Sequence, residues 1–200
     1  MIVLSSPYAV ADEIEIVHTL FEEGLDLLHI RKPDFSTLET VHFIHQIKPE
    51  YRNKLVLHNH HVLAEDFGIN RIHFSEKERR FEVDNPARLS KPCRYKSTST
   101  HSIENFNSLS PEFDYAFLSP VFKSISKEDY HPKTNLFEAL KARKNHRTKV
   151  IALGGISAKN IHKTLENGFD DVALLGSIWN NKNPLKEFKS CLKIALSHLQ

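Results

Sequence analysis

Cysteine and long apolar runs are scarce in this sequence. Its two cysteines, Cys93 and Cys191, are far apart, and neither belongs to the CxxC pair that a redox or zinc motif requires. We therefore expect reduced thiols and a cytoplasmic protein. No apolar stretch approaches the roughly 18–20 residues that span a bilayer, so we expect no transmembrane helix and no membrane partner.

A strong excess of charge of either sign is also missing. The 27 lysines and arginines nearly balance the 25 acidic residues, and a nucleic-acid footprint would need basic residues gathered on one face. We therefore expect no nucleic-acid partner. The first residues, MIVLSSPYAVADE, have no basic segment before their apolar run, which predicts a first strand instead of a signal peptide. No linker, low-complexity tract or charge block occurs, so we predict one domain over residues 1–200.

Eight short apolar runs recur along the chain, each suited to a buried parallel strand. They are Ile2–Leu4, Leu27–Ile30, Lys54–Leu57, Arg71–Phe74, Arg94–Ser97, Tyr115–Leu118, Val150–Leu153 and Val172–Leu175. Helix-like amphipathic stretches lie between them, and this alternation indicates a parallel sheet with right-handed crossovers. Eight units favour closure, so we predict an α/β fold, a single (β/α)₈ TIM barrel, over an open doubly wound sheet.

Glycine, serine and proline positions predict where several helices begin and end. Gly24 would end the first helix, Ser157 is a candidate N-cap for a helix through Leu165, and Pro184 fits the first turn of the last helix. The stretch Glu76–Pro92 is the least regular, and there we expect a helix that is short or missing.

The functional residues of such a barrel come from the carboxyl ends of its strands. Those positions carry cationic, hydroxyl, glycine and histidine groups. They are Arg31, Lys32, His58, Asn59, Ser75 to Glu78, Ser99, His101, Ser119 to Lys127, Gly154, Gly155, Gly176 and Ser177. We therefore expect the functional site at this rim of the barrel.

Two glycine-containing loops predict a phosphate site. IALGGIS (151–157) contains Gly154 and Gly155, and VALLGSIW (172–179) contains Gly176 and Ser177. Glycine lets backbone N–H groups approach an anion closely, and the loops after strands seven and eight are the usual phosphate site of this fold. A tight turn alone would also explain the first pair. We favour phosphate because two such loops occur in the right order.

The segment SPVFKSISK (119–127) offers Ser124, Ser126 and Lys127 after the sixth strand. Hydroxyls and an ammonium group suit phosphate or pyrophosphate oxygens, and a loop can close over them. Composition alone, however, favours an ordinary polar surface loop.

The run HNHH (58–61) is a weaker candidate site. His58 and His60 would share a face of an extended strand and could ligate zinc, but the spacing offers no third ligand. We favour a role for His58 in lining the pocket, with His60 and His61 at the beginning of the next helix.

Five segments together form a recognisable pattern. They are LLHIRKP (27–33), STHS (99–102), SPVFKSISK (119–127), IALGGI (151–156) and DVALLGSI (171–178). In this order they resemble the thiamine phosphate synthase/TenI family, whose fold is a (β/α)₈ barrel. The resemblance implies that Arg31 contacts substrate phosphate and that Ser99 lies near the reacting centre. It also implies that Ser124, Ser126 and Lys127 hold pyrophosphate, while Gly154–Gly155 and Gly176–Ser177 cradle a thiazole phosphate.

The sequence departs from the family's synthases at their magnesium ligands. By resemblance, Asn59 replaces one aspartate, Glu78 stands at the second, and Pro33 occupies the family's lysine position, with Lys32 one place earlier. Mg²⁺ prefers carboxylates together with phosphate oxygens, so these losses should weaken stabilisation of a departing pyrophosphate. We therefore expect either no cofactor or, in a true synthase, Mg²⁺ on Glu78.

TenI-type members of the family lack this metal pair, and two of their motifs are close to this sequence. These motifs are H-I-R (29–31) and S-x-H-S (99–102), where His101 stands at the position of the TenI catalytic histidine. The TenI reaction aromatises a carboxythiazole phosphate by moving a proton, which a histidine can accept and donate near neutral pH. Many synthases also carry this histidine, and a histidine at a helix start can simply bond a carbonyl.

Three functions are therefore weighed. The favoured one is a TenI-like thiazole tautomerase, with His101 and Ser99 at the reacting centre and His29, His58 and Asn59 in the pocket. The alternative is a Mg²⁺-dependent thiamine phosphate synthase that couples an aminopyrimidine pyrophosphate to a thiazole phosphate. The third is a non-catalytic phosphate-binding regulator. Small phosphorylated thiazoles are the expected ligands, and a synthase would also bind aminopyrimidines. A homodimer is possible.

Overall fold

Eight parallel strands form a closed barrel in the order β1 to β8. The computed structural model describes residues 1–83, 94–123 and 134–198. The strands are β1 (Ile2–Leu4), β2 (Leu27–Ile30), β3 (Leu55–Leu57), β4 (Arg71–Phe74), β5 (Tyr95–Thr100), β6 (Tyr115–Leu118), β7 (Lys149–Ala152) and β8 (Asp171–Leu174). The predicted (β/α)₈ barrel is confirmed, and each expected strand is found to within three residues at either end.

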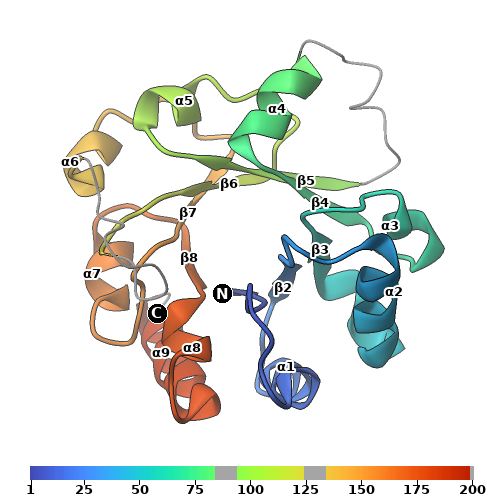
Figure 1. Cartoon of the computed structure of the whole chain (residues 1–200). Coiled ribbons are helices and arrows are strands. Elements are labelled where there is room, and N and C mark those ends of the chain that lie inside the picture. The colour runs from blue at the N-terminus through green and yellow to red at the C-terminus, as the bar shows by residue number, and fades with distance from the viewer. Residues whose placement is uncertain (84–93, 124–133, 199–200) are drawn as a thin grey trace.

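Helices follow the strands and form a ring around them, as seen along the barrel in Figure 1. They are α1 (Glu13–Glu22), α2 (Thr37–Gln46), the 3₁₀ helix η1 (Pro49–Lys54), α3 (Leu63–Asp66), α4 (Glu76–Val83), α5 (Ile103–Asn107), α6 (Leu136–Leu140), α7 (Ile161–Glu166), α8 (Gly176–Trp179) and α9 (Pro184–His198). Pro184 opens the last helix as predicted, because a first-turn proline lacks only an N–H that would have no intrahelical partner.

Alternation along the strands divides the apolar residues between two regions. Leu28, Ile30 and their counterparts on other strands face outward and pack against the helices. The apolar residues that share the barrel interior are Ile2, Leu4, Tyr115, Phe117, Ile151 and Ala173. Other interior positions carry polar side chains, among them His29 on β2, His73 on β4 and Ser97 on β5, and these lie at the floor of the site described below.

One local expectation needs correction, and a second agrees with the residues that the structure describes. Ser157 does not cap a helix: its N–H donates to the Asn160 side chain at 3.0 Å, and regular helix begins one turn later, at Ile161. The stretch expected to have a short or missing helix contains α4, which spans eight residues, and residues 84–93 lie outside the described part of the chain.

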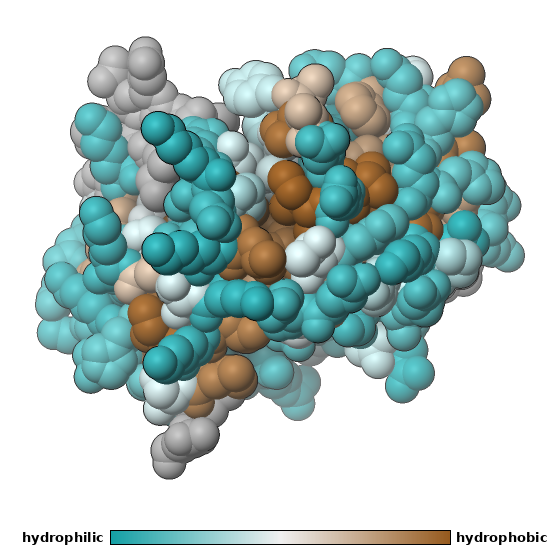
Figure 2. Space-filling model, turned by 90° about the horizontal axis from the view of Figure 1, so that it is seen from below, coloured by the Kyte–Doolittle hydropathy of each residue, from teal (hydrophilic) through white to brown (hydrophobic). Residues whose placement is uncertain are grey.

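The face of the molecule shown in Figure 2 is mainly hydrophilic. Seen from below the view of Figure 1, hydrophilic side chains surround a smaller group of hydrophobic ones near the middle of the face (Figure 2). Within the described ranges, no helix is long and apolar enough to cross a membrane.

A buried ion pair lies behind the carboxyl end of β2. Lys32 Nζ lies 2.5 Å from Glu13 Oε2, and both side chains are less than a tenth exposed. The ammonium group also sits over the rings of Phe35 and Phe43. Burial raises the pKa of Glu13, although Lys32 acts against that shift. Lys32 is therefore a structural residue directed away from the barrel mouth.

Removing the Lys32 ammonium should strongly destabilise the fold. Lys32→Ala leaves the Glu13 carboxyl buried without its cation, and such changes cost about 3–5 kcal/mol. Urea unfolding gives the free energy directly. Lys48→Ala is the matched control, because Lys48 pairs with Glu22 where both side chains are about half exposed, and this loss should stay below about 1 kcal/mol. Equal losses in the two variants would contradict the structural role of Lys32.

Candidate active site

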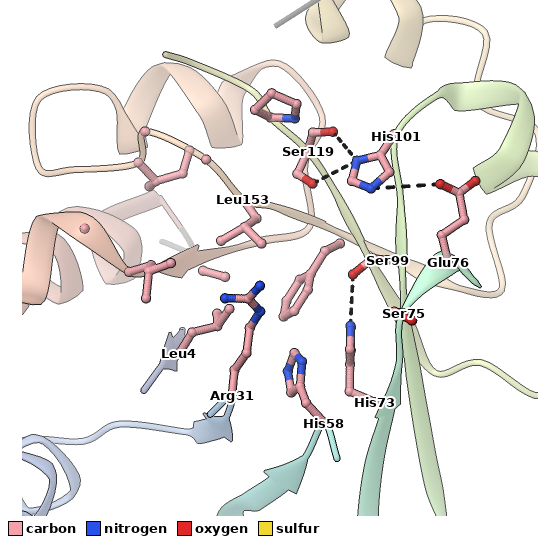
Figure 3. A pocket seen from close by; sticks show the side chains of 18 residues that line it. Leu4, Arg31, His58, His73, Ser75, Glu76, Ser99, His101, Ser119 and Leu153 are labelled. Carbon is pink, nitrogen blue, oxygen red and sulfur yellow. Dashed lines mark hydrogen bonds and ion pairs between the residues drawn. The ribbon is translucent and has the colours of Figure 1, made fainter. Parts of the chain in front are cut away.

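A cavity of about 350 Å³ opens at the carboxyl ends of the strands. Its lining combines the polar side chains of Arg31, His58, His73, Ser75, Glu76, Ser99, His101 and Ser119 with Leu4, Phe117, Pro120, Leu153, Ile156, Ala173, Leu175 and the glycines 154, 155 and 176. Figure 3 shows the polar side chains converging from several strand ends. The expected rim of the barrel therefore carries a preformed pocket.

Arg31 brings a positive charge into this cavity. It follows β2, its backbone N–H donates to Ser5 Oγ at 2.8 Å, and its guanidinium extends among Leu4, Leu153 and His58 (Figure 3). No carboxylate among the described residues forms an ion pair with it. A guanidinium without a protein counter-ion is suited to bidentate binding of a phosphate or carboxylate.

Gly154 and Gly155 allow two loops to approach each other closely. Their φ angles are +100° and +67°, values that favour glycine. A Cβ on Gly154 would lie 2.8 Å from Pro120 Cβ, and one on Gly155 would lie 2.4 Å from the Lys123 carbonyl oxygen. Phe122 N–H also donates to the Gly154 carbonyl at 3.0 Å. The tight-turn explanation of this pair therefore has direct support, and its phosphate role remains a prediction.

Gly176 and Ser177 begin α8 beside the cavity. The first N–H groups of a helix have no intrahelical acceptor, so this turn presents donors to a ligand. The Ser177 hydroxyl is buried and has no hydrogen-bond partner among the described residues. A buried hydroxyl without a partner is costly, and an anion bound at this turn would supply the missing acceptor.

A hydrogen bond to the backbone orients the ring of His101. Its Nδ1 lies 2.9 Å from the Ser119 carbonyl oxygen, which can only accept, so Nδ1 carries the proton. In the neutral ring Nε2 then has the lone pair, and it lies 3.9 Å from Glu76 Oε2 (Figure 3). The ring is about half exposed. His101 therefore both bonds a carbonyl and presents an acid–base nitrogen at the cavity.

Ser99 belongs to a hydrogen-bonded chain across the cavity wall. Its Oγ lies 2.9 Å from His73 Nε2, and His73 Nδ1 lies 2.9 Å from Ser97 Oγ. Ser97 Oγ also donates to the Ile72 carbonyl, so Nδ1 of His73 is the donor and Nε2 accepts from Ser99. The Ser99 hydroxyl is thereby oriented at the reacting wall.

Three histidines are kept uncharged beneath the cavity. Burial is the main cause that lowers the pKa of His29 and His58 well below the ordinary value, with neighbouring positive charge adding to it. Burial, with His61 and Arg31, lowers the pKa of His73 to about 3. Because each ring is neutral near pH 7, the floor of the cavity carries no charge of its own.

Several predicted site residues lie away from this wall or outside the described residues. The Asn59 amide points to the Lys32 carbonyl at 3.5 Å. Glu78 accepts from the Ser75 N–H at 2.8 Å and so caps α4, and no contact of Glu78 with the cavity is found. His60 bonds the Phe35 carbonyl, so it does not join His58. Ser124, Ser126 and Lys127 fall outside the described residues.

His73 was not among the residues expected at the site from the sequence, and Glu76 and Ser119 were included only within the strand-end ranges Ser75 to Glu78 and Ser119 to Lys127, without a role for either. His73 could have been found from alternation, because its neighbours Ile72 and Phe74 are the outward-facing apolar pair of β4. Glu76 stands two residues before Glu78, the expected metal ligand, and only the turn after β4 decides which of the two reaches the cavity. Ser119 contributes through its carbonyl, which no sequence pattern indicates.

A family model described as thiamine monophosphate synthase matches residues 1–178 of the chain. The thiamine-phosphate synthase of Dictyoglomus turgidum is 25% identical over 189 residues, which cover 90% of this chain and 82% of that protein. The thiamine-phosphate synthase of Bacteroides fragilis is 24% identical over 190 residues, covering 90% and 92%.

Solved structures agree with these relatives. A thiamine phosphate pyrophosphorylase from Bacteroides thetaiotaomicron is 30% identical, with a TM-score of 0.76 and coverage of 98% of this chain and 96% of that one. One from Pyrococcus furiosus is 19% identical, with a TM-score of 0.81 and coverage of 100% and 96%, and this likeness shows the fold alone.

The close approach at Gly155 predicts a large effect of one methyl group. Gly155→Ala combines an unfavourable φ with a clash against the Lys123 carbonyl, so it should destabilise the protein by about 2–4 kcal/mol. Gly68→Ala is the control, because Gly68 has a similar φ of +65° but no atom within 4 Å, and it should cost about 1 kcal/mol. Denaturant unfolding measures both values. Equal costs would show that the loops are not packed at Gly155.

Proposed function

The chain belongs to the thiamine monophosphate synthase family, and we propose that it joins an aminopyrimidine pyrophosphate to a thiazole phosphate with release of pyrophosphate. The relatives named above are thiamine-phosphate synthases or pyrophosphorylases, which favours this reaction over the tautomerase that the sequence motifs suggested. Small phosphorylated thiazole and aminopyrimidine molecules are accordingly the proposed substrates.

One geometric observation supports the proposal. A single cavity contains Arg31, which has no counter-ion among the described residues, and adjoins a helix start whose buried hydroxyl has no partner within the same part of the chain. These are two separate anion-binding features, supplied by β2 and by the turn after β8. A synthase must hold two phosphorylated substrates at once, and two anion positions in one pocket meet that requirement.

Each side chain then has a definite task. Gly176 and Ser177 hold the thiazole phosphate through N–H groups and the Ser177 hydroxyl, which has no partner in the described part of the chain. Arg31 holds the pyrophosphate and stabilises the charge that grows on it as its bond to the aminopyrimidine methylene breaks. The apolar walls at Leu153 and Phe117 exclude water from the reacting carbon. By resemblance, Ser124, Ser126 and Lys127 add further contacts to pyrophosphate.

The described donor groups do not fit a magnesium site of the synthase type. Glu76 is the carboxylate in the cavity lining, and its Oε1 already accepts from Arg80 and Asn105, both at 2.8 Å. Asn59 offers a neutral amide, and Glu78 is used as a helix cap. The pair of carboxylates that would complete an octahedron with phosphate oxygens is missing from this set. The tasks assigned above therefore involve no metal ion.

The geometry of His101 favours a second candidate, tautomerisation of a carboxythiazole phosphate. That reaction needs a base facing the ring and develops no pyrophosphate charge. Nε2 of His101 is such a base, because the Ser119 carbonyl holds the proton on Nδ1. Glu76, 3.9 Å from Nε2, would stabilise the ring after it has taken a proton.

The proposed reaction predicts a strong dependence on Arg31. Arg31→Ala should lower kcat/KM for pyrophosphate release by about 100-fold or more, since it removes a cation that acts on the leaving group. The measurement is pyrophosphate produced from aminopyrimidine pyrophosphate plus thiazole phosphate. Arg147→Ala, at an exposed position outside the cavity lining, should leave the rate unchanged. A fully active Arg31→Ala variant would remove the role assigned to this residue.

Proton exchange separates the two reactions. We expect the wild-type protein to release pyrophosphate and to leave the ring protons of a carboxythiazole phosphate unexchanged in D₂O, as followed by NMR. For a tautomerase, exchange would occur instead and would fall about 10²–10⁴-fold in His101→Ala, but not in the exposed His162→Ala control. Binding of thiazole phosphate without either reaction would point to the regulator.

A further inference from the structure

A cluster of three histidines lies at and beneath the cavity floor, and the proposed reaction leaves it without a role. It consists of His29, His58 and His73, hereafter the three-histidine cluster. One ring nitrogen from each lies within 4.8 Å of those of the other two. Imidazole is the commonest protein ligand for transition metals, so this spacing indicates a candidate metal site.

The strand register itself brings the cluster together. Leu57 pairs with Ile72, so the residues that follow them, His58 and His73, are neighbours on adjacent strands. His29 pairs with Val56, two residues before His58, and its side chain therefore points to the same interior face. The convergence is built into the backbone of β2, β3 and β4 and does not depend on a mobile loop.

Two of the rings are held by hydroxyl groups through one nitrogen. His29 Nε2 lies 2.7 Å from the Tyr115 hydroxyl, which leaves Nδ1 directed at His58 Nε2, 2.9 Å away. His73 Nδ1 lies 2.9 Å from Ser97 Oγ, which leaves Nε2 at the cavity wall. Metal-binding histidines commonly have such a partner on the second nitrogen, because it fixes the tautomer and the ring orientation.

A metal ion would replace two contacts within the cluster and its wall. These are the bond between His29 and His58 and the bond from Ser99 to His73 Nε2. Zn–N bonds of about 2.0–2.1 Å put two ligand nitrogens roughly 3.3 Å apart on a tetrahedral ion. The present separations run from 2.9 Å up to 4.8 Å, so side-chain shifts of about an ångström complete the set.

The donor atoms select the type of metal. The cluster offers three neutral nitrogens, and no carboxylate of the described residues joins it. Such a set suits Zn²⁺ or Co²⁺ and is a poor one for Mg²⁺, which requires oxygen ligands. The site is therefore distinct from the magnesium site of the family's synthases, which uses carboxylates.

The fourth ligand would come from the cavity. His58 and His73 line it, while His29 is fully buried below them. Arg31 is close enough to disfavour positive charge on both lining rings. A divalent ion here needs a negative partner, because an unpaired buried charge is costly. Hydroxide or a phosphate oxygen, shared with the Arg31 guanidinium, meets that need.

We propose that the three-histidine cluster binds one divalent transition metal ion, with its fourth position open to the cavity. After treatment with a chelator, the full chain should bind one equivalent of Zn²⁺ by calorimetry. Co²⁺ should produce the visible absorption bands of a tetrahedral nitrogen site. Neither measurement requires turnover, so the outcome is independent of the proposed reaction.

Single substitutions connect the binding to these residues. His73→Ala and His58→Gln should each weaken Zn²⁺ binding at least 100-fold and abolish the Co²⁺ bands. Tyr115→Phe, which removes the partner of His29 Nε2, should weaken binding about 10-fold. His60→Ala is the matched control, because His60 lies in the same HNHH run but bonds the Phe35 carbonyl instead of the cluster. It should bind as the wild type does.

Three outcomes would overturn the proposal. They are the absence of stoichiometric binding, unchanged affinity in both His73→Ala and His58→Gln, and equal loss in His60→Ala. Circular dichroism and urea unfolding identify a variant that fails to fold. His58 is less buried than His73, so His58→Gln still tests the proposal if His73→Ala does not fold. A folded protein that binds no metal would make the cluster a purely hydrogen-bonded chain.

Discussion

The pairing of β1 with β8 closes the sheet, and every feature of the cavity depends on that closure. Ile2 lies opposite Ala173, so the two ends of the strand order become neighbours. The Trp179 indole then donates to the Leu4 carbonyl and ties the turn after β8 to β1. Because β2 follows β1 in the ring, Arg31 and the start of α8 face one cavity. In an open sheet of the same strands they would lie at opposite edges.

Closure also buries the side chains of the interior, and this burial determines the chemistry of its polar residues. Buried polar groups are usually hydrogen-bonded within the protein, and here Tyr115, His29 and His58 form one hydrogen-bonded chain and Ser97, His73 and Ser99 form another. The same burial lowers the pKa of the imidazoles and keeps them neutral. The cavity therefore has a rigid, uncharged floor. Among the described residues that line it, Arg31 supplies the cationic side chain.

The barrel could be predicted from the sequence because buried parallel strands and their helices have strong patterns, and all eight strands were located. The site could be predicted only where a strand end determines it, as for Arg31, Ser99 and His101. Turn geometry decides that Glu76 faces the cavity while Glu78 caps a helix, and no periodicity encodes that choice. The meeting of His29, His58 and His73 depends on the register between strands, which the spacing within HNHH does not reveal, although His58 lines the pocket as expected.

Charge is the quantity that separates the reactions open to this cavity. A departing pyrophosphate gathers several negative charges, whereas a tautomerisation moves one proton and leaves the phosphate charge unchanged. Arg31 is the cation of the described lining, and Glu76 is already engaged with Arg80 and Asn105. A divalent ion on the three-histidine cluster would add positive charge at the floor. By thermodynamic linkage, an anion bound beside Arg31 would then raise the affinity for the metal ion by the same factor by which the metal ion raises the affinity for the anion.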